Sequence, residues 1–152
     1  MLTVNSSWLL LLPAVLLIGC HGSRPENLGA RDGMLASCPA SPNCVSSQAP
    51  DEEHRIAPLP YAGPAGAAMA RLLAIVSSLP RTAVVTRTGS YLHVECTSFL
   101  FRFVDDVEFL ADDAAKVIHV RSASRLGKSD LGVNGQRIEK IRKRWQETAP
   151  PP

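Results

Sequence analysis

Four strand-like segments in the second half of the chain, joined by very short connections, constrain its fold most. They span residues 83–87, 91–100, 101–110 and 116–123, and turn-like stretches interrupt them at 88–90 and 111–113. β-branched and aromatic residues bounded by turn residues are typical of strands. Connections this short join only antiparallel neighbours. The sequence therefore predicts a meander of about four antiparallel strands.

Alternation along these segments predicts which side chains meet the core. In residues 91–98, Cys96 shares a face with Leu92 and Val94, so we expect its thiol to be buried. In residues 101–110, one face carries apolar side chains that should reach the core: Phe101, Phe103, Val107 and Phe109. The opposite face carries Arg102, Val104, Asp106 and Glu108.

One helix is predicted before the meander and one after it. Pro64 suits a first helical turn, and apolar residues then recur at helical spacing as far as Pro80. Asn134 is a suitable N-cap for a helix over residues 135–145 with Ile138, Ile141 and Trp145 on its apolar side. We predict an α+β fold in which two helices cover one antiparallel sheet, in the order helix, meander, helix.

The N-terminus predicts export and a lipid anchor. An apolar run over residues 8–18 ends at Cys20 in the sequence LIGC, which resembles a bacterial lipobox. The run is too short to span a bilayer, which takes about 20 apolar residues. We therefore predict that residues 1–19 are a lipoprotein signal peptide and that Cys20 is acylated. A simple secretory signal or an uncleaved anchor is the alternative, because no Lys or Arg precedes the apolar run.

The predicted lipidation of Cys20 also indicates where the domain begins and where in the cell the protein lies. Residues 20–36 have linker composition and are expected to be a flexible tether; residues 37–147 form a single globular domain, and residues 148–152 a disordered tail. His21, in place of Asp, favours the outer membrane, with the domain facing the periplasm. The membrane is then a partner through the anchor. A net charge of only +2 and export both argue against nucleic acid.

Cys38 and Cys44 form the most informative pair among the four cysteines. They bracket two prolines, which favour a tight loop, and a disulfide across that loop is geometrically reasonable. The alternatives are a reduced pair or a metal site that also uses His54. The spacing is wider than that of zinc-binding pairs and no fourth ligand is apparent, so no metal or cofactor is predicted.

Polar residues gather in two segments that the predicted meander places side by side. Arginine side chains and a glycine-containing loop before a helix suit a small anion such as phosphate or carboxylate. The same residues could instead form an ion-pair network on a solvated sheet face. The candidate ligand-binding set comprises Arg102, Asp105, Asp106, Arg121, Ser124, Arg125 and Asp130.

A hydrolytic site is the third interpretation of these residues. It would use Asp105 and Asp106 as paired carboxylates or Ser124 as a nucleophile, with His93 or His119 as the base. No known nucleophile or phosphate-binding motif supports it, so no catalytic residue is assigned.

Three segments carry a resemblance to a known family. SPNCVSS at 41–47, FRFVDDVEF at 101–109 and VRSASRLGKSDLGVN at 120–134 resemble the signatures of the family called domain of unknown function 1499. The resemblance runs from about Cys38 to Trp145 and implies an envelope or lumenal protein, with no agreed reaction, substrate or cofactor. We expect a non-catalytic envelope lipoprotein that binds a protein partner or a small anion. The alternatives are a hydrolase acting on an anionic envelope substrate and a purely structural module of a membrane complex.

Overall fold

The computed structural model describes residues 22–148, which form six strands and two helices around one core. The elements are β1 (Cys44–Ser46), β2 (Leu59–Pro60), α1 (Ala65–Ser77), β3 (Thr82–Arg87), β4 (Tyr91–Thr97), β5 (Val104–Asp112), β6 (Val117–Ser124) and α2 (Val133–Glu147). The predicted signal peptide at 1–19, the lipidation site Cys20 and the tail from residue 149 lie outside the described residues.

All strands belong to one antiparallel sheet. The order is β1-β6-β5-β4-β3, and β2 also pairs with β6. The predicted α+β class is confirmed, and β3 to β6 form the expected meander. The sheet has six strands rather than about four, because β1 and β2 add to the outer edge of β6. These strands contain only three and two residues, too few to show alternation in a proline-rich segment.

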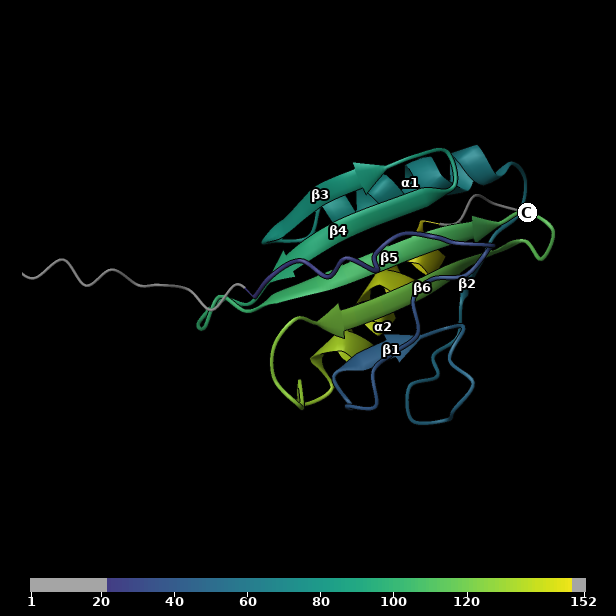
Figure 1. Ribbon diagram of the computed structural model, residues 1–152. Helices are drawn as coiled ribbons and strands as arrows, with labels where there is room; N and C mark the ends of the chain where they lie inside the picture. The colour runs from purple at the N-terminus through teal and green to yellow at the C-terminus, as the bar shows by residue number, and fades with distance from the viewer. Residues whose placement is uncertain (1–21, 149–152) are drawn as a thin grey trace, which may run out of the picture.

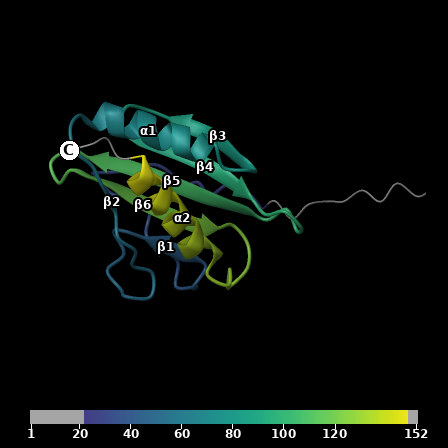
Figure 2. The same ribbon diagram turned by 180° about the vertical axis from the view of Figure 1, so that it is seen from behind.

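Both helices pack against the same face of the sheet (Figure 2). Leu72 and Val76 of α1 and Ile138 of α2 are fully buried there against Phe109 and Val120 of the central strands. Each helix therefore buries an apolar stripe on the sheet, which is what holds this layer together. Cys96 lies on this face and is 7% exposed, as the alternation predicts.

The start of α2 differs from the prediction. Gly132, with φ of +78°, is the N-cap, and Asn134 is already helical with its side chain fully buried. Asp130 satisfies the first turn, because its carboxylate accepts hydrogen bonds from the backbone N–H groups of Gly132 and Asn134 at 3.0 and 2.7 Å. The prediction of Asn134 as the cap was wrong because its amide bonds into the core instead.

The start of β5 also differs. Arg102 has φ of +58°, which ends the extended chain, so β5 begins only at Val104. Val107 and Phe109 are fully buried, as predicted. Phe101 and Phe103 remain 64% and 41% exposed, and the expectation that they reach the core was wrong.

The face of the sheet away from the helices is covered by the N-terminal segment. Residues 22–36 run across β4 and β5 on this side (Figure 1). Leu35 packs with Tyr91 and Leu110, and the backbone N–H of Gly29 donates to Glu108. The predicted tether thus lies along the sheet in this structure. Neither helix of the described residues has the length and apolar content that a membrane span requires.

Candidate functional site

A row of ionisable side chains occupies the sheet face beneath the N-terminal segment, and we call it the polar-face network. Six of its members come from three neighbouring strands, where register pairs His93 with Glu108 and Glu108 with Arg121, and Arg125 directly follows the last of these strands. One step along, Glu95 pairs with Asp106. Side chains that face each other across antiparallel strands lie within contact distance. The network comprises Tyr91, His93, Glu95, Asp106, Glu108, Arg121 and Arg125.

Asp106 is the centre of one half of the network. Arg125 donates from Nε and Nη2 to its two carboxylate oxygens at 2.8 and 2.7 Å, and also pairs with Glu95. The Nε2 of His93 lies 2.8 Å from the Oδ1 of Asp106. Asp106 and His93 are 1% and 3% exposed. A buried carboxylate is thereby held by a two-point arginine contact and an imidazole.

These contacts keep the buried carboxylates ionised. Burial alone raises the pKa of Asp106, but the hydrogen bonds from Arg125 and His93 outweigh it and leave the pKa below its ordinary value. Burial likewise raises the pKa of Glu95, and the hydrogen bonds from Arg125 and Arg24 lower it further than burial raises it. Burial is the largest single influence on the pKa at both sites, and the hydrogen bonds and charges of the arginines and His93 together outweigh it.

Glu108 is the centre of the other half and is fully buried. Its Oε1 accepts hydrogen bonds from the Tyr91 hydroxyl and the Gly29 N–H, both at 2.8 Å, and its Oε2 accepts from Nη1 of Arg121 at 3.0 Å. Burial, followed by the neighbouring Glu108, raises the pKa of Tyr91, so the phenol stays protonated. The Nε of Arg121 is buried and has no hydrogen-bond partner among the described residues.

The N-terminal segment, residues 22–36, covers the polar-face network. Arg24 donates to Glu95 from Nε and Nη2 at 3.0 and 2.6 Å, and Gly29 contacts Glu108 as described. Residues 22–36 thus pair with the two ends of the network and lie between it and solvent. An anion could reach these arginines only by displacing both this segment and the carboxylates.

A second polar cluster lies on the helix side of the sheet, at the start of α2. Asn134 donates to the backbone oxygen of Asn43 and to Ser124 Oγ at 3.0 and 2.9 Å. Arg137 donates to Ser122 Oγ at 3.0 Å and forms an ion pair with Asp105. The cluster comprises Asn43, Asp105, Ser122, Ser124, Asn134 and Arg137, and it fastens α2 to the edge formed by β6 and β1.

The seven predicted ligand-binding residues are therefore not brought together. Asp106, Arg121 and Arg125 lie on one sheet face, and Asp105 and Ser124 lie on the other. Arg102 is exposed on the loop between β4 and β5, and Asp130 caps α2. Adjacent residues of a strand point to opposite faces, which separates Asp105 from Asp106 and rules them out as a carboxylate pair at one site.

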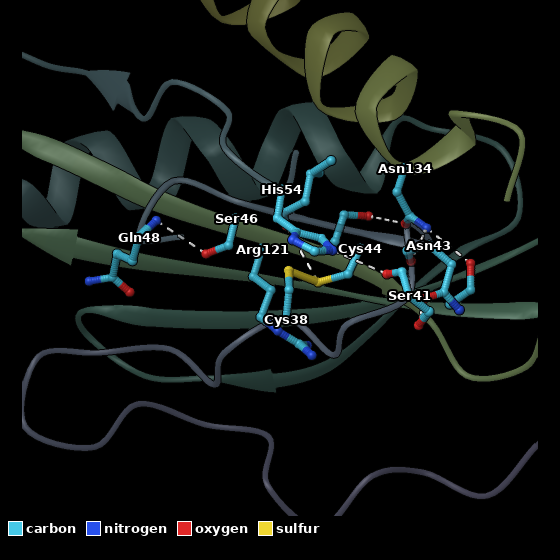
Figure 3. The surroundings of a disulfide bond; sticks show 12 residues. Cys38, Ser41, Asn43, Cys44, Ser46, Gln48, His54, Arg121 and Asn134 are labelled. Atoms are coloured by element: carbon cyan, nitrogen blue, oxygen red, sulfur yellow. Dashed lines mark hydrogen bonds between the residues drawn. A yellow bond between two sulfur atoms is a disulfide. The ribbon is translucent and has the colours of Figure 1, made fainter. Parts of the chain in front are cut away.

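The disulfide between Cys38 and Cys44 is confirmed, with a Cα–Cα distance of 5.7 Å (Figure 3). His54 lies nearby but bonds to other groups. Its Nδ1 is 2.6 Å from the Asp51 carboxylate, and its Nε2 is 3.2 Å from the backbone oxygen of Ser41. The hydrogen bond to Asp51 raises the pKa of His54. In residues 22–148, no group of three metal-ligating side chains comes together.

The histidines also differ from the roles that hydrolysis would need. Ser124 Oγ accepts from Asn134 rather than from a histidine. Among the described residues, the serine whose hydroxyl contacts a histidine ring is Ser47, with Oγ 3.2 Å from Nδ1 of His119. Ser47 Oγ also accepts the N–H of Val120 at 2.9 Å, and this pair joins the segment after β1 to β6. These contacts are a structural link between the segment after β1 and β6.

A pocket of about 550 Å³ lies between the two helices and β2, and sequence reasoning missed it. It is lined mainly by apolar atoms, and its size falls in the range of about 300–1,000 Å³ typical of small-molecule sites. Arg71 is the lining residue that carries a charge. The lining residues are Pro60, Tyr61, Ala62, Ala67, Ala68, Arg71, Trp145, Gln146 and Thr148.

Arg71 has an unusual environment in this pocket. Its guanidinium carbon lies 3.3 Å from the centroid of the Trp145 ring, a stacked cation–π contact. Its Nε is buried and has no hydrogen-bond partner among residues 22–148. Burial lowers the pKa of Arg71 from its ordinary value, although not enough to discharge a guanidinium. The signal in the sequence was that Arg71 is the one charged residue between positions 64 and 80.

Comparison with known proteins identifies the family of the chain. A family model described as "Protein of unknown function (DUF1499)" matches residues 34–144. A search of curated proteins finds no match. The matched region contains the disulfide loop, the whole sheet, α1 and most of α2. The chain therefore belongs to the DUF1499 family.

Proposed function

We propose that the protein is a non-catalytic envelope lipoprotein that binds a small amphipathic anion in the pocket between α1 and α2. The observation that carries this proposal is Arg71, a charged side chain with a buried and unpartnered Nε in an otherwise apolar pocket. A buried polar group without a partner is unfavourable, and a ligand acceptor would relieve that cost.

The pocket chemistry defines the ligand class. A carboxylate or phosphate would accept a charge-assisted hydrogen bond from Arg71, which is worth about 1.5–3 kcal/mol. An apolar body would lie against Pro60, Ala68 and Trp145. Trp145 is held in place because its Nε1 donates to the backbone oxygen of Pro60 at 2.9 Å. The wall of the pocket is thus preorganised for a ligand with one acidic end.

Two features of the chain support the envelope location. The LIGC sequence ending at Cys20 follows an apolar run, and the Cys38–Cys44 disulfide is typical of an oxidising compartment. Acylation of Cys20 would then tether the domain to the membrane, on the periplasmic side of the outer membrane.

The pairing of the polar-face network supports a structural role for that face. The hydrolase alternative has less support. His93 and Asp106 contact each other, but both are buried beneath residues 22–36. A substrate would have to unfold that segment to reach them. Binding at the pocket needs no such change.

Fluorescence of Trp145 tests the proposal directly. The chain has two tryptophans, and the other, Trp8, lies in the predicted signal peptide. Titration with dodecanoate, an apolar chain with one carboxylate, should change the Trp145 emission with saturation. Arg71→Gln keeps the polar side chain but removes the charge, and we expect roughly tenfold weaker binding, equivalent to about 1.4 kcal/mol.

Two controls isolate the charge. Arg87→Gln removes an exposed arginine on β3 and should bind dodecanoate as the wild type does. Dodecanol has the same chain without the carboxylate and should bind the wild type more weakly than dodecanoate does. Equal affinity of wild type and Arg71→Gln for dodecanoate, or no saturable change in the wild type, would contradict the proposed function.

A further inference from the structure

Exposed apolar side chains gather at one end of the molecule, at the hairpin between β4 and β5. Phe99, Leu100, Phe101 and Phe103 are 78%, 72%, 64% and 41% exposed. The rings of Phe101 and Phe103 stack with centroids 5.7 Å apart. These four large apolar residues lie close together in the sequence, with only Arg102 between them. They do not contribute to the core, because β5 begins only at Val104.

The loop between β6 and α2 extends this surface. The loop adds Leu126 and Leu131, and the first residue of α2 adds Val133; these side chains are 44%, 88% and 45% exposed. The loop is beside the hairpin because the N–H of Arg125 bonds to the backbone oxygen of Val104, and Val133 and Ser98 line the same groove. Both lie at the end of the molecule where the described chain begins (Figure 1). We call these seven residues the apolar tip.

Cationic side chains surround the apolar tip. The guanidinium of Arg81 lies 5.5 Å from the ring centroid of Phe99. Arg102 and Lys128 are exposed on the two loops. None of these three forms an ion pair with another of the described residues. Aromatic and aliphatic side chains bordered by free Arg and Lys are the composition of surfaces that enter the interface of a bilayer.

The N-terminal end of the described chain leads to the same place. A Cβ on Gly22 would lie 3.0 Å from Arg125 Cβ and 3.1 Å from Leu126 Cγ, so Gly22 is packed against the apolar tip. Cys20 is two residues earlier, which places its Cα within about 7 Å of Gly22 even in a fully extended chain. Acyl chains on Cys20 would therefore enter the membrane close to Leu126.

We propose that the apolar tip inserts into the interfacial layer of a bilayer that contains anionic lipid, next to the acylated Cys20. This inference rests on the proposed lipid anchor and goes beyond it. A flexible tether over residues 20–36 would let the domain float away from the membrane, whereas the apolar tip fixes its orientation. The pocket at Arg71 lies near the opposite end of the sheet, because Pro60, which lines it, pairs with Val117 at the start of β6.

Depth-dependent quenching in vesicles tests the insertion. The full-length protein, purified from membranes, is reconstituted in vesicles of phosphatidylcholine and phosphatidylglycerol. An NBD fluorophore is attached at Leu100→Cys in the apolar tip or at Gly89→Cys in the turn between β3 and β4. Gly89 is at the far end of β4, and a side chain there meets nothing within 4 Å, so it is a matched exposed control.

Labelling is selective because Cys38 and Cys44 are disulfide-bonded and Cys96 is buried. With nitroxide lipids carrying the spin label near the headgroup, NBD at position 100 should shift to the blue and lose most of its emission. NBD at position 89 should keep its emission. Equal emission from the two positions would overturn the proposed insertion.

A second measurement separates this inference from the lipid anchor. The unsubstituted protein takes up NBD only if the Cys20 thiol is free, so labelling of that protein contradicts acylation, and its emission is then subtracted from that of both variants before they are compared. If Cys20 is blocked but position 100 is unquenched, the anchor stands and the insertion is wrong. Vesicles without phosphatidylglycerol should give weaker quenching at position 100, because they lack the anionic headgroups that Arg81, Arg102 and Lys128 would meet.

Discussion

Two carboxylates of the polar-face network are buried, and each is held by hydrogen-bond partners. Asp106 is 1% exposed and Glu108 is fully buried, yet each has an arginine partner. Such pairs contribute little net stability compared with an apolar core, but removing one partner leaves an uncompensated charge. The network is therefore a feature on which single substitutions should have large effects.

Asp106→Asn should destabilise the protein at neutral pH and flatten its acid sensitivity. The substitution removes the two-point acceptor of Arg125 and leaves Glu95 as its charged partner, so we expect a loss at the low end of the about 3–5 kcal/mol that breaking a buried pair costs. The pKa of Asp106 is lowered by folding, so its contribution is present above the ordinary Asp value of about 3.9 and is lost as pH falls through the folded pKa.

Urea unfolding from pH 7 down to pH 3 measures this effect. The free energy of unfolding of the wild type should fall more steeply in acid than that of Asp106→Asn. Glu52→Gln is the control, because the Glu52 side chain is 92% exposed. Parallel pH profiles for wild type and Asp106→Asn would show that the contacts of Asp106 do not favour its ionised form.

The sequence predicts which sheet face the polar side chains of this network occupy better than it predicts what surrounds them. Alternation placed Asp106 and Glu108 on one face, and register brings them to Arg121 and Arg125. It could not predict that residues 22–36, which have linker composition, would cover that face. Arg71 was overlooked as a binding residue because a lone arginine on a buried helix shows its significance only when its neighbours are known.

At the scale of elements, the long strands and helices followed from local pattern and the short strands did not. β4 and β6 contain seven and eight residues, enough to show alternation, whereas β1 exists because the disulfide loop brings Cys44 to Ala123. The first residues of α2 depend on Asp130 and Gly132, whose roles are set by tertiary contacts of Asn134. Local pattern therefore predicts elements, and distant contacts set their ends.

Removing the disulfide should loosen β1. The double substitution of Cys38 and Cys44 by Ser should lower the free energy of unfolding by about 2–2.5 kcal/mol, because closing so short a loop restricts the unfolded chain modestly. Hydrogen exchange should show faster exchange at the amides of Val45 and Ser46 with little change in β4. Unchanged stability and unchanged exchange in β1 would show that the strand does not depend on the disulfide.

In the whole molecule, the two proposed binding surfaces lie at different ends. The apolar tip and Gly22 lie at one end, and the Arg71 pocket lies near the other. The sheet, with the polar-face network on one of its faces, connects the two ends. If both proposals hold, the pocket faces away from the membrane, and a ligand could enter it without crossing the lipid surface.

Native mass spectrometry of the protein purified from membranes tests the account most directly, because one spectrum reports both the anchor and the ligand. The account predicts a chain that begins at an acylated Cys20 and carries an acidic small molecule, and it predicts that Arg71→Gln loses this adduct but keeps the acyl mass. A chain that retains residues 1–19 without acylation, or wild-type and Arg71→Gln spectra with the same adducts, would contradict it.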